Sequence, residues 1–366
     1  MKFTCNRSAL LKEISIAQEI IASRNAISIL SNIYLEAKES TLKIKATDMK
    51  VNFETEVPVT VLESGSTTIF GDKFLGIINT FPYDEIEFNQ SDINILIKPV
   101  NAKKPEYKLK CIASDKFPEF PAPEGDFIEL PIKSFKEMIQ QTVFAISDDE
   151  TRYYMNGVFL EKADDKISMV ATDGRRLAFI SKDADKNIND FNGIIIPPKI
   201  LNTLVKRSGE EGLVSVCVNS KIIFINFASY KFSSILLEGQ FPSYKRVIPE
   251  NQQNSLTVNR MEMLNALHRA AIMVEQKSHR VYMGISPGKI AVYSEESEIG
   301  NVNDEIPCKY DGAEMTIALN YRYIEEPFRV MDCDDICIRF TEPTKAITVL
   351  PVPEKDFFHI VMPMQS

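Results

Sequence analysis

The sequence predicts an α+β protein made of three similar domains, and two observations carry this prediction. The first is an internal repeat: residues 33–48 and 158–173 alternate apolar and polar side chains and both end in Ala-Thr-Asp, at an offset of about 125 residues. A fainter third copy covers residues 281–295. The second is length, because 366 residues exceed what one ordinary core holds. Strand-like and helix-like periodicities occur in each copy, so each predicts one α+β domain.

Each copy contains the same predicted elements in the same order. An amphipathic helix opens it, followed by a hairpin, further strands, a second helix and a closing meander. The Pro-rich stretches 117–125 and 241–249 interrupt the pattern and are typical of linkers. They place the domains at residues 1–125, 126–252 and 253–366. The opening helix of the first copy has an apolar face of Leu10, Leu11, Ile14, Ala17 and Ile21. The second helices are predicted at residues 73–81, 197–207 and 320–331.

Composition excludes several classes of protein. A hydrophobic content of 44% with 25% charged residues is typical of a globular protein. No apolar run reaches the roughly 20 residues of a spanning helix, and the first residues lack the apolar segment of a signal peptide. We therefore expect a cytoplasmic protein without membrane contact.

The six cysteines are scattered, apart from Cys333 and Cys337 on one predicted strand, and they lack further Cys or His at zinc-ligand spacing. Reduced structural thiols are expected.

The sequence lacks the common catalytic and phosphate-binding motifs. The sequence contains no Gly-rich phosphate loop, no nucleophile elbow and no His-Glu-x-x-His motif. The acidic runs 148–150 and 164–165 offer oxygen ligands for a hard cation, but runs between regular elements usually face water. His268 is expected to be a surface residue rather than a base. Asp173 is a conceivable general base, but its repeat counterpart Asp48 stands in the same local sequence, which favours a structural role at a turn. We expect no enzyme activity, no cofactor and no metal.

The distribution of charge qualifies the formal net charge of −9, which by itself argues against nucleic acid as a partner. The six predicted helices carry a net positive charge, so the strands and loops are more acidic than the chain as a whole. Ordinary surface variation is one interpretation. The other is a division of labour, in which helices face a polyanion and supply the Lys and Arg that replace its counterions.

Four segments carry a resemblance to a known family: residues 152–157, 171–178, 241–249 and 361–364. Through them, and along essentially the whole chain, the sequence resembles the bacterial DNA sliding clamp family, the beta subunit of DNA polymerase III. The resemblance implies three repeated DNA-clamp domains per chain, with helices lining a central hole and sheets outside, in a ring-shaped head-to-tail homodimer. It implies a processivity factor that encircles double-stranded DNA without sequence preference and slides along it.

The resemblance also implies DNA contacts at Arg24, Lys73, Tyr153 and Tyr154. The two basic residues would supply charge for phosphate, and the tyrosines would stack on or hydrogen-bond to a strand. A half-buried strand edge is the alternative explanation of the tyrosine pair. The family often carries an amide at position 149, whereas Asp149 stands here, and its carboxylate would repel phosphate.

Finally, the resemblance implies a pocket that receives a short linear motif with apolar anchors. Its partners would be the replicative DNA polymerase, the clamp loader and repair polymerases, and the protein would associate with the nucleoid. The last residues, Gln365 and Ser366, depart from the basic and apolar ending of many relatives. A DNA-independent scaffold for protein assembly is the alternative function. The implied pocket residues are Met155, Thr172, Gly174, Arg175, Arg176, Leu177, Pro242, Arg246, Val247, Asn320, Tyr323, Val361, Met362, Pro363 and Met364.

Overall fold

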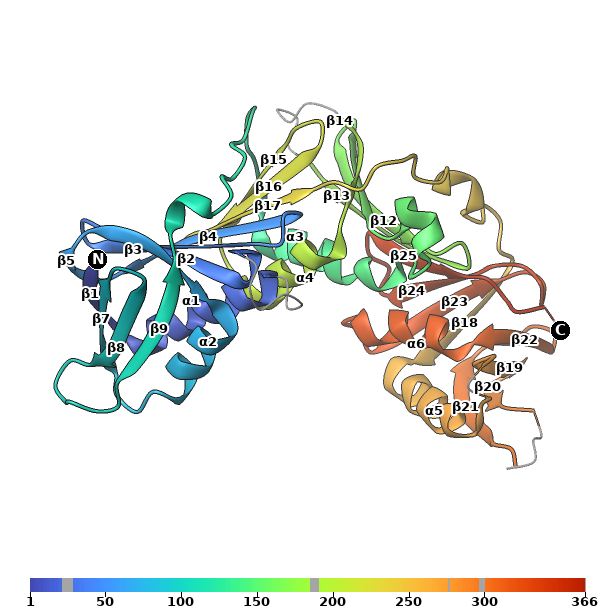
Figure 1. Cartoon of the computed structure of the whole chain (residues 1–366). Helices are drawn as coiled ribbons and strands as arrows, with labels where there is room; N and C mark the ends of the chain where they lie inside the picture. Colours follow the sequence, from blue (N-terminus) through green and yellow to red (C-terminus); the bar gives the residue numbers. More distant parts are fainter. Residues whose placement is uncertain (22–28, 185–190, 276, 296–299, 366) are drawn as a thin grey trace. The chain divides into compact units, whose positions relative to one another are not determined.

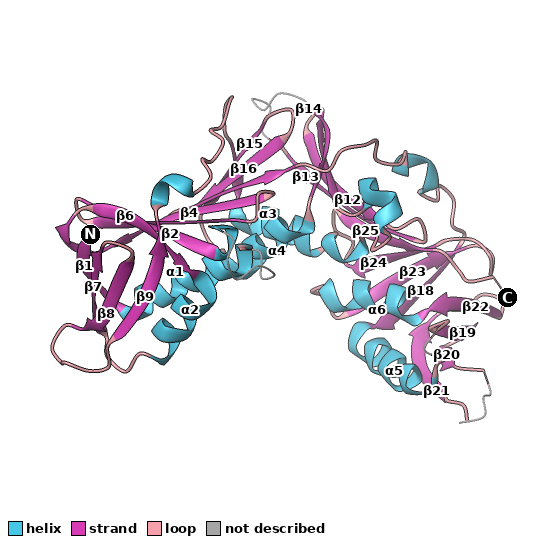
Figure 2. Ribbon diagram, in the orientation of Figure 1, coloured by secondary structure: helices cyan, strands magenta, loops and turns pink. Residues whose placement is uncertain are grey.

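A computed structural model of the chain describes residues 1–21, 29–184, 191–275, 277–295 and 300–365. It divides into two compact units. The first unit comprises Met1–Lys133 and Lys206–Leu236, and the second comprises Ser134–Val205 and Leu237–Ser366. Each unit contains one large antiparallel sheet with helices packed on it (Figure 2).

The first unit holds the N-terminal repeat and part of the central one. Its sheet has 13 strands in the order β10-β15-β16-β17-β4-β3-β2-β6-β9-β8-β7-β1-β5. Helices α1 and α2 lie side by side, and α1 packs on β3 and β4 (Figure 1). The elements are β1 (Lys2–Asn6), α1 (Arg7–Ile20), η1 (Ile29–Ser31), β2 (Asn32–Lys38), β3 (Thr41–Thr47), β4 (Val51–Pro58), β5 (Thr60–Glu63), β6 (Gly65–Phe70), α2 (Gly71–Thr80), β7 (Glu85–Ser91), β8 (Asn94–Pro99), β9 (Tyr107–Ile112), η2 (Ser114–Lys116), β10 (Ile128–Pro131), β15 (Leu213–Val218), β16 (Ile222–Phe227) and β17 (Tyr230–Ile235).

The second unit holds the rest of the central repeat and the C-terminal one. Its 12 strands follow the order β14-β11-β12-β13-β25-β24-β23-β18-β21-β20-β19-β22, and α5 packs beside α6 and against β21. Helices α3 and α4 each cross the division between the units. The elements are α3 (Ile132–Gln140), η3 (Val143–Ala145), η4 (Glu150–Met155), β11 (Val158–Ala163), β12 (Lys166–Thr172), β13 (Arg176–Asp183), β14 (Phe191–Ile196), α4 (Pro198–Arg207), η5 (Tyr244–Val247), β18 (Asn254–Asn259), α5 (Arg260–Met273), β19 (Arg280–Ser286), β20 (Lys289–Tyr293), β21 (Asn303–Lys309), β22 (Met315–Asn320), α6 (Tyr321–Val330), β23 (Asp335–Phe340), β24 (Ile347–Val352) and β25 (Phe357–Val361).

The predicted order of elements is confirmed, with one omission. Each repeat opens with a short strand before its first helix, namely β1, β10 or β18. These strands contain only four to six residues, too few for a clear alternation. The first and third repeats then start their helix with the same cap. The Asn6 side chain accepts hydrogen bonds from the amides of the residues two and three positions on, and Asn259 does the same.

Each sheet joins strands from two repeats. In the first unit, β17 of the central repeat pairs with β4 of the N-terminal repeat, with Phe232 opposite Phe53. In the second unit, β13 of the central repeat pairs with β25 of the C-terminal repeat, with Leu177 opposite Ile360. The paired strands bury apolar side chains on one face, so each pairing continues a core as well as a hydrogen-bond ladder.

A buried hydrogen-bond chain connects three elements of the second unit. His359 on β25 is 1% exposed, and its Nε2 lies 3.1 Å from Oε1 of Gln141, which follows α3. The Gln141 amide in turn donates to the carbonyl of Val330 at the end of α6, at 2.8 Å. Since the amide nitrogen is occupied, the imidazole donates to the amide oxygen. Burial lowers the pKa of His359 to about 3, so the ring is neutral at neutral pH.

The cysteines are all unpaired, as expected. Burial raises the pKa of every one of the six thiols, and raises that of Cys5 to about 12. None of the helices in the described part of the chain is both long and apolar enough to cross a membrane.

Candidate functional site

The site is built around the turn between β12 and β13 in the second unit. Asp173 accepts hydrogen bonds from the backbone amides of Arg175 and Arg176 at 2.8 and 3.0 Å. Asp48 in the first unit does the same for Lys50 and Val51, at 2.9 and 2.7 Å. The predicted structural role of this aspartate at a turn is therefore confirmed in both repeats.

Gly174 occupies the one position of this turn with a left-handed backbone, at φ +88°. Its amide is bonded to the hydroxyl of Thr172 at 3.1 Å. In the first unit Met49 takes the equivalent place at φ +73°, where a side chain is strained but tolerated. Because the two turns otherwise match, the glycine at position 174 leaves open the space beside the turn that a side chain would otherwise fill.

An apolar cavity of about 150 Å³ opens beside this turn. Leu177 on β13, Ile360 on β25 and Met155 on η4 form a buried floor, whereas Val247 and Met362 are 58% and 43% exposed at the mouth. The full lining is Met155, Thr172, Gly174, Arg175, Arg176, Leu177, Pro242, Ser243, Tyr244, Val247, Ile360 and Met362. The cavity therefore has an apolar interior with the exposed side chains of Val247 and Met362 at its rim. Such a cavity can hold one apolar side chain of a ligand.

Most of the predicted pocket residues line this cavity, and some do not. Asn320 and Tyr323 line a neighbouring polar cleft instead. Val361 ends β25 and is 1% exposed in the sheet. The remaining predicted residues that do not line the apolar cavity are Arg246, Pro363 and Met364.

Three lining residues were missed by sequence reasoning: Ser243, Tyr244 and Ile360. The strand pairing that sets Ile360 opposite Leu177 is long-range, so no local pattern reveals it. Ser243 and Tyr244 lie within the segment 241–249 that carries the family resemblance, and that position was an available signal. The Tyr244 hydroxyl donates a hydrogen bond to the Glu161 carboxylate at 2.5 Å. Burial is the main cause that raises the pKa of Tyr244 well above its ordinary value, and the Glu161 carboxylate is the second cause.

Arg176 forms a wall shared by the apolar cavity and the polar cleft. Its Nε donates to Asp173 at 3.1 Å, its Nη2 donates to the carbonyl of Phe144 at 2.7 Å, and its Nη1 pairs with Glu326 on α6. The guanidinium also stacks 4.7 Å from the ring centre of Tyr323. The donors of Arg176 are thus bonded to three different parts of the chain. These bonds hold the side chain in place between the two spaces and leave it few donors for a ligand.

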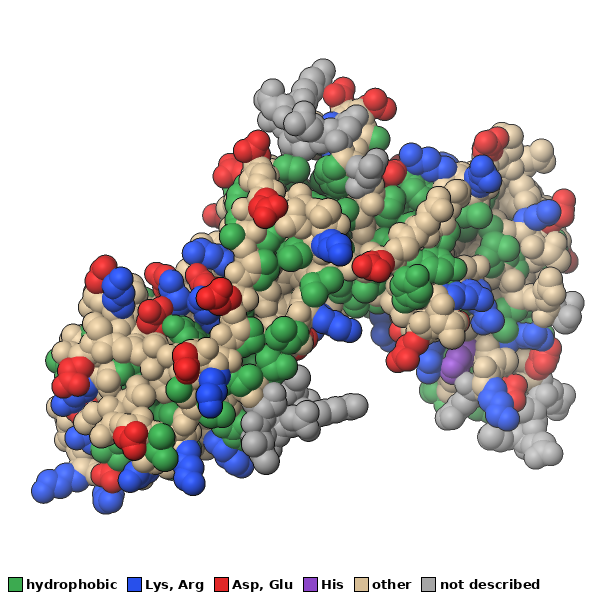
Figure 3. All heavy atoms as spheres, turned by 45° about the horizontal axis from the view of Figure 1, so that its top comes forward, with side chains coloured by type: hydrophobic (Ala, Val, Ile, Leu, Met, Phe, Trp, Pro, Cys, Tyr) green, Lys and Arg blue, Asp and Glu red, His purple; other side chains and the backbone are tan. Residues whose placement is uncertain are grey.

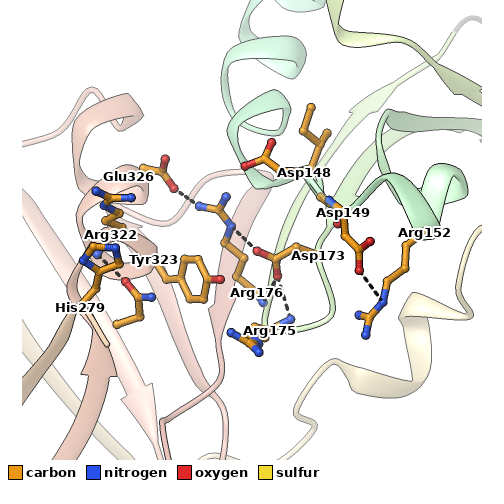
Figure 4. A pocket seen from close by; sticks show the side chains of 13 residues that line it. Asp148, Asp149, Arg152, Asp173, Arg175, Arg176, His279, Arg322, Tyr323 and Glu326 are labelled. Atoms are coloured by element: carbon orange, nitrogen blue, oxygen red, sulfur yellow. Dashed lines mark hydrogen bonds and ion pairs between the residues drawn. The ribbon is translucent and has the colours of Figure 1, made fainter. Parts of the chain in front are cut away.

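The polar cleft has a volume of about 410 Å³ and is drawn in Figure 4. Asp149 caps η4 through the amide and hydroxyl of Thr151, at 2.9 and 2.6 Å, and pairs with Arg152 at 3.5 Å. The hydrogen bonds from Thr151 lower the pKa of Asp149, which is therefore ionised. The lining residues are Ile146, Ser147, Asp148, Asp149, Arg152, Asp173, Arg175, Arg176, His279, Asn320, Arg322, Tyr323 and Glu326.

The C-terminal segment closes over this region through backbone hydrogen bonds. The amide of Met362 donates to the carbonyl of Arg175 at 2.8 Å, and that of Met364 donates to the carbonyl of Ala318 on β22, also at 2.8 Å. Residues 362–364 thus connect the turn beside β13 with the last strand of the sheet. This anchoring gives the Met362 side chain a defined place at the mouth of the apolar cavity.

The residues predicted to contact DNA are spread over both units. Lys73 lies on α2 with a side chain 70% exposed, 3.7 Å from Asp72. Tyr153 and Tyr154 lie on η4 rather than at a strand edge, with ring centres 5.8 Å apart, and Tyr153 is 52% exposed. Arg24 falls outside the described residues. The alternative of a half-buried strand edge for the tyrosine pair is therefore wrong.

Part of the positive charge predicted for the helices is neutralised within the fold. Glu19 pairs with Lys206 at 2.5 Å and also with Arg207. Arg269 pairs with Asp304 at 2.5 Å. Lys and Arg are interspersed with Asp and Glu over the visible face of each unit (Figure 3). Any attraction for a polyanion must therefore come from a few exposed cations rather than from an evenly basic helical surface.

The alternative chemical sites find no support in the geometry. Within the described ranges, no group of three or more His, Cys, Asp or Glu side chains is arranged to hold a metal ion. His268 is 47% exposed and pairs with Glu325 at 2.5 Å, beside Arg329, as expected of a surface residue.

Comparisons with known proteins agree over the whole chain. The sequence matches the N-terminal, central and C-terminal domains of the DNA polymerase III beta subunit at residues 1–121, 129–243 and 245–365. It is 43% identical to the beta sliding clamp of Treponema pallidum and 26% identical to that of Escherichia coli, each over 100% of both chains. Among solved structures, it superimposes on a sliding clamp from Pseudomonas aeruginosa with a TM-score of 0.94 at 26% identity, over 100% of both chains. The sliding clamp of Bacillus subtilis gives 0.93 at 25% identity, over 100% of this chain and 99% of that one. The chain therefore belongs to the DNA polymerase III beta subunit family, the family of the bacterial beta sliding clamps.

Proposed function

We propose that the protein is a DNA polymerase processivity factor: a ring that encircles duplex DNA, slides along it and tethers the replicative polymerase. The observation that carries this proposal is the match to beta sliding clamps over the full length of the chain, in sequence and in fold. The family acts by binding and not by catalysis, and the protein is not an enzyme. The alternative of a DNA-independent scaffold has no comparable support.

The ring would be a head-to-tail homodimer, so that two chains supply six copies of the repeat. Contacts between unlike surfaces close into a ring when the rotation between subunits permits it. The three domains would be residues 1–125, 126–252 and 253–366. Encirclement holds DNA by topology, so the phosphate contacts need only be weak and indifferent to sequence. A few exposed cations such as Lys73, with Arg24 and the tyrosines of η4, would suffice. Asp149 is ionised and paired, which argues against a direct phosphate contact there.

The apolar cavity would receive an anchor residue of a short linear motif. Its volume of about 150 Å³ accommodates one Leu- or Phe-sized side chain, and burying such a side chain contributes roughly 1.5–3 kcal/mol. A flexible methionine at the mouth suits a site with several partners. These partners would include the replicative polymerase, the clamp loader and repair polymerases, bound in turn at the nucleoid in the cytoplasm.

The test separates encirclement from ordinary DNA binding. The protein is loaded onto closed circular DNA and onto linear DNA of the same sequence, and retention is measured in salt that abolishes phosphate binding. We expect retention on circles and loss through the ends of linear molecules, because a topological link has no salt dependence, whereas ordinary contacts weaken steeply with salt. Equal loss from both templates would contradict encirclement. Retention on circles that ends on cutting with a nuclease is the internal control.

A further inference from the structure

Each unit of the structure contains a junction at which strands of two repeats pair. The first junction is the pairing of β4 with β17 in the first unit, and the second junction is the pairing of β13 with β25 in the second unit (Figure 1). The apolar cavity lies at the second junction. Because equivalent elements of the repeat form both junctions, the first junction shows the same backbone arrangement with different side chains.

The turn before each junction is held by the same hydrogen bond. In the first unit the Thr47 hydroxyl accepts from the amide of Met49 at 2.9 Å, and in the second unit the Thr172 hydroxyl accepts from the amide of Gly174 at 3.1 Å. The backbone at this position is left-handed in both turns. Met49, whose side chain is exposed, therefore stands in the space that Gly174 leaves open.

The rim is anchored in the same way at both junctions. At the end of β17, the amide of Ile235 donates to the carbonyl of Lys50 at 2.9 Å, just as the amide of Met362 after β25 donates to the carbonyl of Arg175 at 2.8 Å. Ile235 is 46% exposed and Met362 is 43% exposed. Each junction thus presents one half-exposed apolar side chain at the same place.

The linker beside each junction packs on the equivalent strand. The Phe117 ring lies 5.3 Å from that of Tyr34 on β2, and the Phe241 ring lies 4.7 Å from that of Phe159 on β11. Each phenylalanine is followed directly by a proline, and the proline of the second unit lines the apolar cavity. Turn, rim and linker together therefore give the first junction the frame of the cavity.

The two junctions differ at the floor. At the second junction the facing residues are Leu177 and Ile360, and both are buried. At the first junction they are Asn52 and Ser233. The Asn52 amide nitrogen donates to the Ser233 hydroxyl at 2.9 Å, and its oxygen accepts from the Thr47 hydroxyl at 2.6 Å. An apolar ligand side chain on this floor would remove water from polar groups and would gain little from burial.

We propose that the first junction is a closed copy of the peptide site, and that Met49, Asn52 and Ser233 keep it closed. The inference rests on the proposed function, because it takes the apolar cavity to be the site of a peptide anchor. It makes these three side chains determinants of specificity although they touch no ligand. They restrict each chain to one peptide with a Leu or Phe anchor, even though its repeats build two frames for such a peptide.

The polar floor can be exchanged for an apolar one without leaving a buried hydroxyl unpaired. Asn52→Leu removes the acceptor of the Thr47 hydroxyl. The Thr172 hydroxyl, which has a leucine opposite it, shows where that donor goes, because it donates to the carbonyl of Arg176 at 2.6 Å. The equivalent carbonyl in the first unit is that of Val51.

The first step of the experiment closes the second junction in the full-length protein. Gly174→Met, Leu177→Asn and Ile360→Ser install the side chains of the first junction, whose own turn already holds a left-handed methionine. The affinity of a labelled synthetic peptide with a Leu-Phe anchor is measured by fluorescence anisotropy. We expect it to fall at least about tenfold, because the anchor loses its apolar floor.

The second step opens the first junction in this closed protein. Met49→Gly, Asn52→Leu and Ser233→Ile together should restore binding to within about tenfold of the wild-type dissociation constant. Met49→Gly alone is the matched control, because it clears the space beside the turn but leaves the floor polar. This single substitution should restore no binding, and restoration by it would show that the floor does not keep the junction closed.

A second version of the opened protein guards against overpacking. Ser233 faces Phe224 on β16, whereas Ile360 faces Thr348 on β24. Ser233→Ile therefore adds volume beside a large ring. The second version also carries Phe224→Thr, which reproduces the pairing of the second junction. Thermal melting shows which version is folded, and binding is measured on that one.

Photo-crosslinking locates the bound peptide and also tests the wild-type protein directly. The anchor phenylalanine of the peptide is replaced by benzoylphenylalanine, and crosslinked fragments are identified by mass spectrometry. In the wild-type protein we expect crosslinks to Met362 and none to Ile235. In the opened protein we expect crosslinks to Ile235.

The outcomes separate this inference from the proposal on which it rests. Crosslinking of the wild-type protein at Ile235 would overturn the inference, because the first junction would already be open. A folded opened protein that does not bind the peptide would overturn it as well, and both results leave the apolar cavity as the peptide site. Undiminished binding by the closed protein would instead overturn the cavity as the peptide site, and the copy with it.

Discussion

Shortening Met362 to alanine tests which methionine of the C-terminal segment forms the apolar cavity. The Met362 side chain lines the cavity mouth and is 43% exposed, so slightly less than half of its surface is available for a ligand to cover. The substitution removes three heavy atoms. At about 0.8 kcal/mol for each methylene-sized group buried, the covered fraction contributes about 1 kcal/mol. We therefore expect Met362→Ala to weaken an anchor peptide about fivefold.

Met364→Ala is the matched control for this substitution. Met364 does not line the cavity, and its contact with Ala318 is made by its backbone amide, which alanine retains. We expect affinity within about twofold of wild type. In Met362→Ala the part of the deleted side chain that is already buried should lower the unfolding free energy by about 1–1.5 kcal/mol, which leaves the protein folded. Anisotropy gives the affinity and thermal melting the stability. A larger loss of affinity from Met364→Ala, or none from either variant with folding intact, would refute the placement of the cavity mouth.

Three further predictions concern stability and DNA. Because the pKa of His359 is about 3 in the folded protein against about 6.5 unfolded, its contribution is complete above pH 6.5 and is lost as pH falls. Denaturant titrations should show about 2 kcal/mol lost from this residue between pH 7 and 5, and His359→Gln should show correspondingly less acid sensitivity. Gly157→Ala would place Cβ 2.6 Å from the carbonyl of Ile196 and should cost about 1–3 kcal/mol, whereas Gly76→Ala on α2 meets nothing within 4 Å and should stabilise by about 0.5–1 kcal/mol; equal melting shifts would contradict this. Lys73→Glu should weaken loading on DNA with less than about 0.5 kcal/mol change in stability, and unchanged loading at low salt would remove Lys73 from the DNA-facing surface.

The features that could be predicted from sequence are those encoded locally or by repetition. The element order, the hairpin at residues 158–172 and the turn role of Asp173 each depend on a short pattern present in more than one copy. The short opening strands escaped because four to six residues carry too weak a pattern. Their presence becomes evident only through their partners, such as β7 beside β1.

The candidate site was predictable only where its residues are adjacent in sequence. The turn at residues 172–177 and the stretch around Pro242 supplied most of the apolar cavity. Ile360 reaches it through a long-range strand pairing, and Asn320 and Tyr323 prove to line a separate space. The division between an apolar cavity and a polar cleft depends on where the donors of Arg176 find their partners, and these come from three elements distant in sequence.

The pairing of strands from different repeats has a consequence for how the protein is made. Strand β4 gains its partner β17 only after about 180 further residues have been translated, and β13 waits as long for β25. At roughly 5–20 residues per second these intervals last about 10–35 s. During that time the nascent chain presents a row of unpaired amides and carbonyls on a strand with an apolar face, which is a template for pairing with another chain. The repeats seen in the sequence are therefore not independent folding units. Fragments cut at residue 125 or 252 should aggregate under conditions in which the intact chain does not.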